Sequence, residues 1–391
     1  MIGVLEDDVK GKVVIAANTA WYLANFRLNL ATALQSAGYE VIAIAPRGDD
    51  SARIEAAGVQ FIPVPMDNKG TNPVRDLGLL LRLVRVLRRE RPAVYLGYTV
   101  KPNIYGGMAC RLLGIPSIHN ISGLGTAFIN DTWLTRVVRR LYLLGMCKAV
   151  KVFFQNPDDL YLFVQNGLVS AEQADRLPGS GVDTDWFSPH ENTSGSEGSR
   201  ARFLLSARLL WDKGIGEYVD AARMLVSEGR NVECRLLGFL DAENRAAIPP
   251  EVVNEWEREG VIRYLGSARD VRPLVTQADC VVLPSYYREG VPRSLLEAAS
   301  MGKPVITTDA VGCRETVDDG VNGFLCRPRD VSDLADKMRR MVEMPSAERA
   351  EMGRRGREKM EREFDERIVI ERYLQAVEEI VSGSLVAEET P

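Results

Sequence analysis

The sequence predicts an α/β protein made of two doubly wound domains in tandem, and three observations support this fold class. Short apolar runs alternate with helical patterns along the chain, which is typical of parallel sheets with crossover helices. The alternation stops at the polar, Gly- and Ser-rich stretch HENTSGSEGSR (190–200) and then starts again. At 391 residues, the chain also exceeds the roughly 250–300 residues beyond which a single core is uncommon.

The first domain is predicted to span residues 1–189. Its nearly continuous apolar runs predict strands that are covered on both faces. Helical patterns separate these runs, among others at 24–37, 73–90 and 132–149. The predicted strands are KVVIAA (12–17), VIAIAP (41–46), FIPVP (61–65), AVYLGY (93–98), SIHNIS (117–122) and KVFFQN (151–156).

Residues 190–200 are predicted to be a linker, and a second domain is predicted over 201–365. The remaining residues, 366–391, are predicted to form an amphipathic helix and a tail that could pack back on the N-terminal domain. Two such domains leave a cleft between them, and open α/β sheets bind ligands at the loops that follow their strands. The strands predicted in the second domain are RFLLSA (202–207), ECRLLG (233–238), IRYLG (262–266), CVVLPS (280–285) and PVITTD (304–309).

Composition and charge argue against several functional classes. The net charge of −5 makes nucleic acid an unexpected partner. Two histidines and six dispersed cysteines argue against a zinc site, a redox motif or a Ser–His–Asp triad, and buried free thiols in a reducing cytoplasm are expected. The acidic N-terminus lacks the apolar core of a signal peptide, and the sequence has no uncharged apolar run of about 18 residues. We therefore expect a cytoplasmic protein.

The loop after the first predicted strand, NTAWYLANFRLNL, contains no glycine. The G-x-G-x-x-G dinucleotide fingerprint is therefore absent there, which weakens a dehydrogenase interpretation. Arg27 lies early in the helical pattern that follows. It is either a solvated arginine or a contact for an anion.

A second loop, within SARLLWDKGIGEYVDAARML (206–225), carries Arg208 and Lys213 where a strand turns into a helix that begins near Gly214. Cations at a helix N-terminus are unfavourable by some tenths of a kcal/mol, although Asp212 could offset this as a cap. A bound anion explains the pair better, because free N–H groups and cations together bind phosphate. The alternative is a pair of surface cations near a cap.

The third loop, REGVPRSLLEA (288–298), places Pro292 at the first position of a helix that is expected to end near Gly302. Glu289 then lies on the loop and Glu297 in the second turn, while Arg293 lies beside the free N–H groups of the helix start. A diphosphate bound between the two cationic helix ends would supply the anion that the cations and free N–H groups of both ends require. Glu297 could accept hydrogen bonds from a ribose diol, and Glu289 from hydroxyls of a second group on the diphosphate. The alternative is a capped helix with two solvated glutamates.

These segments carry a resemblance to a known family. SARLLWDKG (206–214), together with the stretch from YLGSARDV to GVNGFLC (264–326), resembles the C-terminal half of family 4 retaining glycosyltransferases. These enzymes have the GT-B fold, in which two Rossmann-like domains face each other across a cleft. The resemblance is strong over 200–330 and weaker over 12–128, where KPNIYGGMACRLLGIP and GLGTAF are also similar. Within the family, the chain resembles bacterial enzymes that extend polyprenyl-diphosphate-linked glycans, such as those adding N-acetylgalactosamine.

The resemblance implies a role for each matching residue. In the family, an Arg and a Lys spaced like Arg208 and Lys213 bind the donor diphosphate. Glutamates spaced like Glu289 and Glu297 contact the donor sugar and the ribose. The implied donor is a nucleotide sugar, with uracil as the base and a hexose or N-acetylhexosamine as the sugar, and the base is expected to meet the backbone of YLGSARDV. The implied acceptor is a polyprenyl-diphosphate-linked glycan.

No cofactor and no metal are expected, because cationic side chains and helix N–H groups would meet the charge of the leaving group. The resemblance thus implies a catalytic set of Arg208, Lys213 and Glu289. The implied donor site comprises Arg208, Lys213, Leu265, Glu289, Val291, Arg293, Ser294, Leu295 and Glu297, and the acceptor site comprises Arg27, Lys101, Ser122 and Gly123.

Two short motifs depart from the family pattern. Many members carry a His just before a Gly-Leu-Gly-like turn, but here that position is Ser122, and His119 is predicted to be a partly buried strand residue. No general base is therefore assigned, and we expect retention by front-face attack in which the leaving phosphate accepts the proton. Asp183-x-Asp185 resembles the D-x-D metal motif of a different glycosyltransferase fold, but its place at the domain boundary indicates a turn.

Residues 70–151 carry 13 Lys and Arg against three acidic residues, a net charge of +10. Two helical patterns, LGLLLRLVRVLRRER and WLTRVVRRLYLLGMCK, mix Leu and Val with arginines. They could lie on an anionic bilayer surface, which predicts peripheral association with the inner face of the cell membrane. The alternative is that their apolar stripes face the core and their arginines face water.

The main hypothesis from the sequence is a retaining, metal-independent glycosyltransferase. One alternative is a GT-B sugar-nucleotide epimerase, which the scarcity of histidine disfavours because an epimerase needs acid/base groups around the sugar. The other is a nucleotide-sugar-binding protein without turnover. The joint presence of two cations and two glutamates on loops after strands disfavours it.

Overall fold

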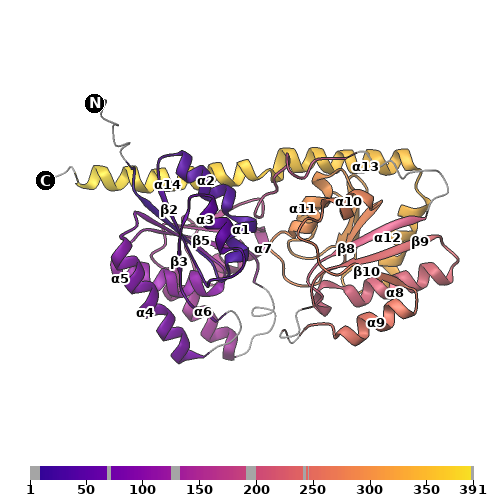
Figure 1. Cartoon of the computed structure of the whole chain (residues 1–391), viewed down its shortest axis with the longest axis horizontal. Coiled ribbons are helices and arrows are strands. Elements are labelled where there is room, and N and C mark those ends of the chain that lie inside the picture. Colours follow the sequence, from indigo (N-terminus) through magenta and orange to yellow (C-terminus); the bar gives the residue numbers. More distant parts are fainter. Residues whose placement is uncertain are drawn as a thin grey trace. The chain divides into compact units, whose positions relative to one another are not determined.

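The computed structural model describes residues 9–67, 72–124, 133–190, 200–240, 244 and 246–388 of the chain (Figure 1). Its contacts divide the chain into two compact units. Unit 1 comprises Met1–Ser180 with Arg367–Pro391, and unit 2 comprises Gly181–Glu366. Each unit contains one fully parallel sheet, which confirms the predicted α/β class. Most of the predicted linker, residues 191–199, lies outside the described residues.

The sheet of unit 1 has seven strands in the order β3-β2-β1-β4-β5-β6-β7. The first six correspond to the predicted apolar runs. The seventh was not predicted, because ADR offers one apolar residue and its side chains are half-buried or exposed at the sheet edge. The strands are β1 (Lys12–Ala16), β2 (Glu40–Ala45), β3 (Gln60–Pro63), β4 (Val94–Tyr98), β5 (Ser117–Ile121), β6 (Lys151–Phe154) and β7 (Ala174–Arg176).

Helices cover both faces of this sheet (Figure 1). One face packs against α1 (Ala20–Phe26), α2 (Leu28–Ser36), α3 (Ser51–Ala56) and the C-terminal α14 (Glu366–Glu388). α14 joins this core through buried residues that include Val369, Tyr373 and Val377. The other face packs against α4 (Pro73–Glu90), α5 (Gly107–Leu113), α6 (Trp133–Met146) and α7 (Pro157–Gln165), with a π-helical turn η1 (Pro102–Gly106) before α5.

The helical pattern predicted over 24–37 is helical in the structure, but it is divided between two helices. α1 starts earlier, at Ala20, where the Thr19 hydroxyl caps it by accepting a hydrogen bond from the Tyr22 N–H at 3.1 Å. Arg27 then breaks the helical path with φ −134° and ψ 0°, and α2 begins after it. The apolar spacing alone did not reveal this break, because the residues on either side of it face the same core.

The sheet of unit 2 has six strands in the order β10-β9-β8-β11-β12-β13. The sequence missed β13, a four-residue strand that begins with a glycine. The strands are β8 (Ala201–Ser206), β9 (Val232–Leu237), β10 (Ile262–Tyr264), β11 (Cys280–Leu283), β12 (Val305–Thr308) and β13 (Gly323–Cys326). The helices are α8 (Ile215–Ser227), α9 (Pro250–Arg258), α10 (Arg272–Gln277), α11 (Arg293–Ser300), α12 (Val331–Glu343) and α13 (Ser346–Lys359), with short turns η3 (Trp211–Lys213), η4 (Arg314–Thr316) and η5 (Met360–Phe364).

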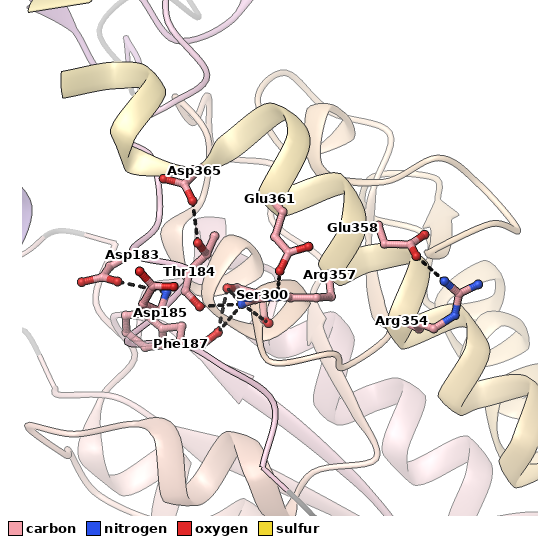
Figure 2. A network of polar contacts seen from close by, with 10 residues as sticks. All are labelled: Asp183, Thr184, Asp185, Phe187, Ser300, Arg354, Arg357, Glu358, Glu361 and Asp365. Carbon is pink, nitrogen blue, oxygen red and sulfur yellow. Dashed lines mark hydrogen bonds and ion pairs between the residues drawn. The ribbon is translucent and has the colours of Figure 1, made fainter. Parts of the chain in front are cut away.

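The start and the end of unit 2 are joined by a polar network (Figure 2). The Arg357 guanidinium donates to the Thr184 carbonyl at 2.6 Å, the Phe187 carbonyl at 3.1 Å and the Ser300 carbonyl at 3.0 Å. In the same network, Asp183 Oδ1 accepts hydrogen bonds from the backbone N–H groups of Asp185 and Trp186. The Asp183-x-Asp185 segment is therefore a turn, as the sequence indicated.

The buried thiols follow the expectation from composition. Five of the six cysteines are buried, and Cys147 is partly exposed. His119 on β5 is fully buried, between the side chains of Asn103 and Ser117. It is thus more deeply buried than the sequence suggested.

Candidate functional site

The sheet order of unit 2 fixes where a ligand is expected. From β8 the chain builds the sheet through β9 and β10 on one side, and then returns to place β11 on the other side of β8. The strand order therefore reverses between β8 and β11, and ligands of such sheets bind beyond the carboxyl ends of the strands at this switch point. The two loops that meet there are 207–214, after β8, and 284–292, after β11.

The loops bring Lys213 and Glu289 together, although 76 residues separate them in the sequence. The Lys213 ammonium contacts Glu289 Oε1, and each side chain is only 11 % exposed. Ser285 Oγ donates to the same carboxylate oxygen at 3.0 Å. The structure thus forms a nearly buried ion pair at the switch point, between two residues that the sequence assigned to one site.

Tyr287 and Arg208 flank this pair. The Lys213 ammonium lies 5.0 Å from the centre of the Tyr287 ring. Burial raises the pKa of Tyr287, the Glu289 carboxylate raises this pKa further, and the Arg208 guanidinium lowers it. Arg208 is itself exposed, so its cation lies at the surface of the same cluster.

Two glycines allow the loops to pack closely. Gly214 has a φ of 73°, and a Cβ there would lie 2.0 Å from the Pro284 carbonyl oxygen. Gly312, after β12, has a φ of 80°, and its Cβ would lie 1.8 Å from the Gly290 carbonyl oxygen. Any side chain at either position would push apart the loops that carry Lys213 and Glu289.

Asp212 acts through its backbone rather than as a side-chain cap. Within the described residues, no side chain caps α8, whose N-cap is Gly214. The Asp212 carbonyl instead accepts hydrogen bonds from the Tyr286 and Tyr287 N–H groups, at 3.1 and 3.0 Å. The capping role expected for Asp212 is therefore wrong, and this residue ties the two switch-point loops together.

Helix α11 begins with a cation because that cation has a carboxylate on the next turn. Arg293 Nε lies 3.0 Å from Glu297 Oε1, at the i and i+4 positions of one helix face. Burial raises the pKa of Glu297, and the Arg293 guanidinium opposes this shift. The helix starts one residue later than predicted, with Pro292 as the N-cap, and no side chain in the described structure caps it.

The remaining donor-site candidates differ in what they can offer a ligand. Val291 and Leu295 have buried side chains in the core of unit 2, so only their backbones could meet a ligand. The Leu295 N–H already donates to the Pro292 carbonyl, so it is not one of the free N–H groups expected at the helix start. The Leu265 N–H likewise donates to the Leu236 carbonyl at 2.8 Å. Ser294 is partly exposed in the first turn of α11.

Sequence reasoning missed Ser285 and Tyr287, which contact the ion pair directly. Gly214 and Gly312, which hold the loops in place, were also not assigned to the site. The sequence did indicate where Ser285 and Tyr287 lie, since the segment PSYYREG directly follows the apolar run of β11. Which of its side chains would turn toward Lys213 depended on the packing of the two loops.

In unit 1, the burial of Arg27 decides against one of its two sequence interpretations. Arg27 is 2 % exposed, so the solvated alternative is wrong. Its guanidinium lies 4.3 Å from the centre of the Tyr98 ring and donates to Tyr22 Oη at 3.2 Å and Ser180 Oγ at 3.1 Å. No acidic side chain pairs with Arg27 in the described part of the chain, and its Nε has no hydrogen-bond partner there.

The other acceptor-site candidates follow β4 and β5. The Lys101 ammonium is 2.6 Å from Asp76 Oδ1, and the Tyr105 hydroxyl donates to Asp76 Oδ2 at 3.0 Å. Lys101 therefore links η1 to α4 in this structure. Ser122 and Gly123 directly follow β5, and the rest of the GLGTAF motif, from residue 125 on, lies outside the described residues.

Fold and site together define a class of protein. Two parallel-sheet α/β units, the second with clustered cations and carboxylates at its switch point, are typical of proteins that bind nucleotides carrying a further group. Residues 189–359 match the family of glycosyl transferases group 1, and residues 23–179 match the glycosyl transferase 4-like domain. The chain belongs to the glycosyltransferases that combine these two domains.

Similar proteins extend the comparison over nearly the whole chain. N,N'-diacetylbacillosaminyl-diphospho-undecaprenol alpha-1,3-N-acetylgalactosaminyltransferase of Campylobacter jejuni is 26 % identical over 373 residues, covering 92 % of this chain and 96 % of the relative. UDP-Gal:alpha-D-GlcNAc-diphosphoundecaprenol alpha-1,3-galactosyltransferase of Escherichia coli is 22 % identical and covers 75 % of this chain and 76 % of its own.

Solved structures confirm the fold. A glycosyltransferase from Rickettsia africae superposes with a TM-score of 0.77 at 17 % identity, covering 95 % of this chain and 98 % of its own. The Anabaena protein HepE, crystallised with UDP, superposes with a TM-score of 0.75 at 18 % identity, covering 94 % of this chain and 99 % of its own. The fold is therefore GT-B, with two Rossmann-like domains.

Proposed function

We propose that this glycosyltransferase moves a hexose or an N-acetylhexosamine from a UDP-linked donor to a hydroxyl of a polyprenyl-diphosphate-linked saccharide, in the biosynthesis of a polysaccharide. The observation that carries the donor assignment is the Lys213–Glu289 pair at the switch point of unit 2. The printed activities of the Campylobacter jejuni and Escherichia coli relatives support the acceptor class, because both act on saccharides linked to undecaprenol through a diphosphate.

The site residues have distinct proposed roles. The donor diphosphate binds to Arg208, Lys213 and the start of α11, so that phosphate oxygens replace the Glu289 carboxylate as partners of Lys213. Glu289 then accepts hydrogen bonds from hydroxyls of the sugar, and Glu297 from the ribose diol. The cations Arg208 and Lys213 and the N–H groups at the start of α11 stabilise the negative charge that builds up on the leaving diphosphate.

The reaction is proposed to retain the anomeric configuration by front-face attack. The bond between the anomeric carbon and the diphosphate oxygen breaks, and the acceptor hydroxyl forms a new bond to that carbon on the same face of the sugar. The acceptor hydroxyl passes its proton to the leaving diphosphate oxygen. His119 takes no part, because it is fully buried and burial lowers its pKa from 6.5 to about 3.

A membrane surface is the proposed location of the acceptor, and the exposed side of helix α4 supports this proposal. Its buried stripe, which includes Leu79, Leu83 and Leu87, faces the core. Its opposite side carries Val74, Leu77 and Leu81, which are 80, 57 and 58 % exposed, followed by the exposed Arg85 and Arg88 on the same stripe. The alternative from the sequence, in which the apolar stripe faces the core and the arginines face water, agrees with the buried leucines and the exposed arginines, but it does not account for the exposed Val74, Leu77 and Leu81.

We define the basic–apolar face as the outward-facing residues of α4, α5 and α6, which lie on one side of the unit 1 sheet (Figure 1). Apolar side chains and cations mixed in this way favour an anionic bilayer surface. None of the helices in the described ranges is long and apolar enough to span a bilayer. The face comprises Val74, Leu77, Leu81, Arg85, Arg88, Arg111, Leu112, Arg136, Val137, Arg140, Leu143 and Leu144.

The substitution Lys213→Ala tests the proposed donor site. We expect loss of transfer, and a much smaller stabilisation by UDP in a thermal-shift assay, where a ligand at 100 times its dissociation constant adds about 2.7 kcal/mol. Lys359→Ala is the matched control. It removes a similarly buried lysine, paired with Asp318 at 2.6 Å, elsewhere in unit 2. Wild-type turnover in Lys213→Ala would refute the proposal.

Glu289→Gln separates binding from turnover. We expect a rate loss that exceeds any loss of UDP affinity, because the amide keeps the shape of the carboxylate while losing its charge. Donor-turnover products then discriminate the alternatives. Free sugar and UDP support a transferase, a new sugar isomer supports an epimerase, and tight donor binding without turnover supports a binding protein.

A further inference from the structure

Unit 1 has its own switch point. Its strand order reverses between β1 and β4, so the loops after these two strands, 17–19 and 99–101, meet at the carboxyl edge of the sheet. The Asn18 N–H donates to Thr99 Oγ1 at 3.1 Å and ties the two loops together. This is the position in unit 1 that corresponds to the donor site of unit 2, and ligands of open α/β sheets are expected there.

An exposed indole lies at this point. Trp21, in the first turn of α1, is 52 % exposed although Trp is usually well buried. The Phe26 ring packs against the indole edge to face, with ring centroids 5.2 Å apart and an interplanar angle of 89°. This contact restricts rotation of the Trp21 side chain. The indole is therefore packed against a second ring while about half of the Trp21 surface stays exposed to solvent.

A polar side chain, Asn25, lies one helical turn after Trp21 on the same side of α1. Asn25 Nδ2 donates to the Trp21 carbonyl at 2.8 Å, and Asn25 Oδ1 accepts from the Arg53 guanidinium at 3.2 Å. The adjoining loop is held in an unusual shape, since Thr99 has a φ of 63°, a conformation that β-branched residues rarely adopt. Strained backbone of this kind clusters at binding sites, where the surrounding structure enforces it.

We propose that Trp21 is the stacking platform for a pyranose ring of the acceptor saccharide. A pyranose has an apolar C–H face and a rim of hydroxyls, which suits a fixed aromatic surface with amide and guanidinium groups beside it. This inference rests on the proposed function and deepens it, because it names the part of the acceptor that unit 1 recognises.

The placement of Trp21 favours a sugar over a bilayer. Trp also occurs at membrane interfaces, where its amphipathic ring suits the headgroup region. However, α1 packs on the face of the sheet that is opposite to α4, α5 and α6. Trp21 therefore does not belong to the basic–apolar face. The experiments below include a measurement that would detect a membrane contact of Trp21.

The kinetic test compares Trp21→Ala with Trp21→Phe, using a farnesyl-diphosphate-linked N-acetylhexosamine as the acceptor probe. We expect Trp21→Ala to raise the KM for this acceptor about five- to ten-fold and to leave the KM for the UDP-sugar unchanged, with Trp21→Phe closer to wild type. Tyr161→Ala is the matched control, because Tyr161 is a 66 % exposed aromatic on α7 of the same unit. Wild-type acceptor KM in Trp21→Ala overturns the inference alone. If the wild-type protein turns over no UDP-sugar, the proposed function is overturned together with this inference.

A second measurement does not depend on turnover. With 5-fluorotryptophan incorporated, the resonance of Trp21 is assigned by its loss in Trp21→Phe. The acceptor probe should shift this resonance, whereas farnesyl diphosphate alone should not. An equal shift with farnesyl diphosphate, a shift with phosphatidylglycerol vesicles alone, or no shift under turnover conditions would each overturn the sugar assignment.

Discussion

At the scale of single residues, Lys213 and Glu289 show how a charge pair can serve a site and the fold together. Each is 11 % exposed, so removing either one leaves the other nearly buried without its partner. Breaking such a pair costs several kcal/mol. The control Lys359→Ala removes another lysine that is nearly buried and paired, although its partner Asp318 is 52 % exposed. Arg27 is a contrasting case, because its buried cation rests against tyrosine rings and hydroxyls.

His119 predicts a pH-dependent stability. The folded state keeps this imidazole neutral down to a pKa of about 3, whereas the unfolded chain protonates it below 6.5. The unfolded state therefore binds more protons between these values, and the free energy of unfolding falls as the pH falls below 6.5. At pH 5 the loss from this residue is about 2 kcal/mol relative to pH 8.

Urea unfolding at pH 8 and pH 5 measures this effect. His119→Asn should lose about 2 kcal/mol less between the two pH values than the wild-type protein. His190→Asn, which changes the other histidine at an exposed position, should follow the wild-type protein. Parallel behaviour of wild type and His119→Asn would contradict the prediction, whatever the absolute stability of the variant.

At the scale of elements, helix α11 is fixed at both ends by different means. Its start carries the Arg293–Glu297 ion pair. Its last residue, Ser300, is held by Arg357, whose guanidinium donates to the Ser300 carbonyl and hydroxyl, both at 3.0 Å (Figure 2). A cation at this end also suits the negative end of the helix dipole.

Arg357→Met is expected to lower the free energy of unfolding by about 2–3 kcal/mol, because carbonyls of Thr184, Phe187 and Ser300 lose a charged donor. Arg357→Lys should recover only part of this loss, since a single ammonium does not reproduce the planar donor geometry. The control is Arg354→Met, which removes an exposed arginine paired with Glu358 in the same network (Figure 2). Equal unfolding midpoints in urea for the Arg357 and Arg354 variants would refute the role given to Arg357.

At the scale of the whole molecule, the charges are distributed unevenly. The chain carries a net charge of −5, yet residues 70–151 alone carry +10. Among the described residues of α4, Asp76 is paired with Lys101, and Glu90 is paired with Arg89 and Lys12, so neither acid is paired with Arg85 or Arg88 of the basic–apolar face. The basic–apolar face can therefore attract an anionic surface although the molecule as a whole is acidic.

Vesicle co-sedimentation tests this face. The protein should bind vesicles containing phosphatidylglycerol, bind pure phosphatidylcholine weakly, and release when salt screens the charges. Leu77→Gln with Leu81→Gln should weaken binding about ten-fold or more, because two leucines lose their burial in the interface. Val226→Gln, at an exposed apolar position on α8 of unit 2, is the control. Binding that is indifferent to lipid charge and to the two leucine substitutions would exclude this face.

The sequence by itself determined the two parallel sheets and the loops that carry the candidate chemistry. Buried parallel strands are continuous apolar runs, and Asn72 and Pro73 mark the start of α4, so local chemistry was enough to place these elements. Short edge strands such as β7 and the break at Arg27 carried no such local signal. Only the tertiary structure decided that Arg27 is buried, that Lys213 meets Glu289 across 76 residues, and that Ser285 and Tyr287 join them. The physical reason is that these contacts depend on which strands lie side by side, and strand order is set by long-range packing that the local pattern of residues does not encode.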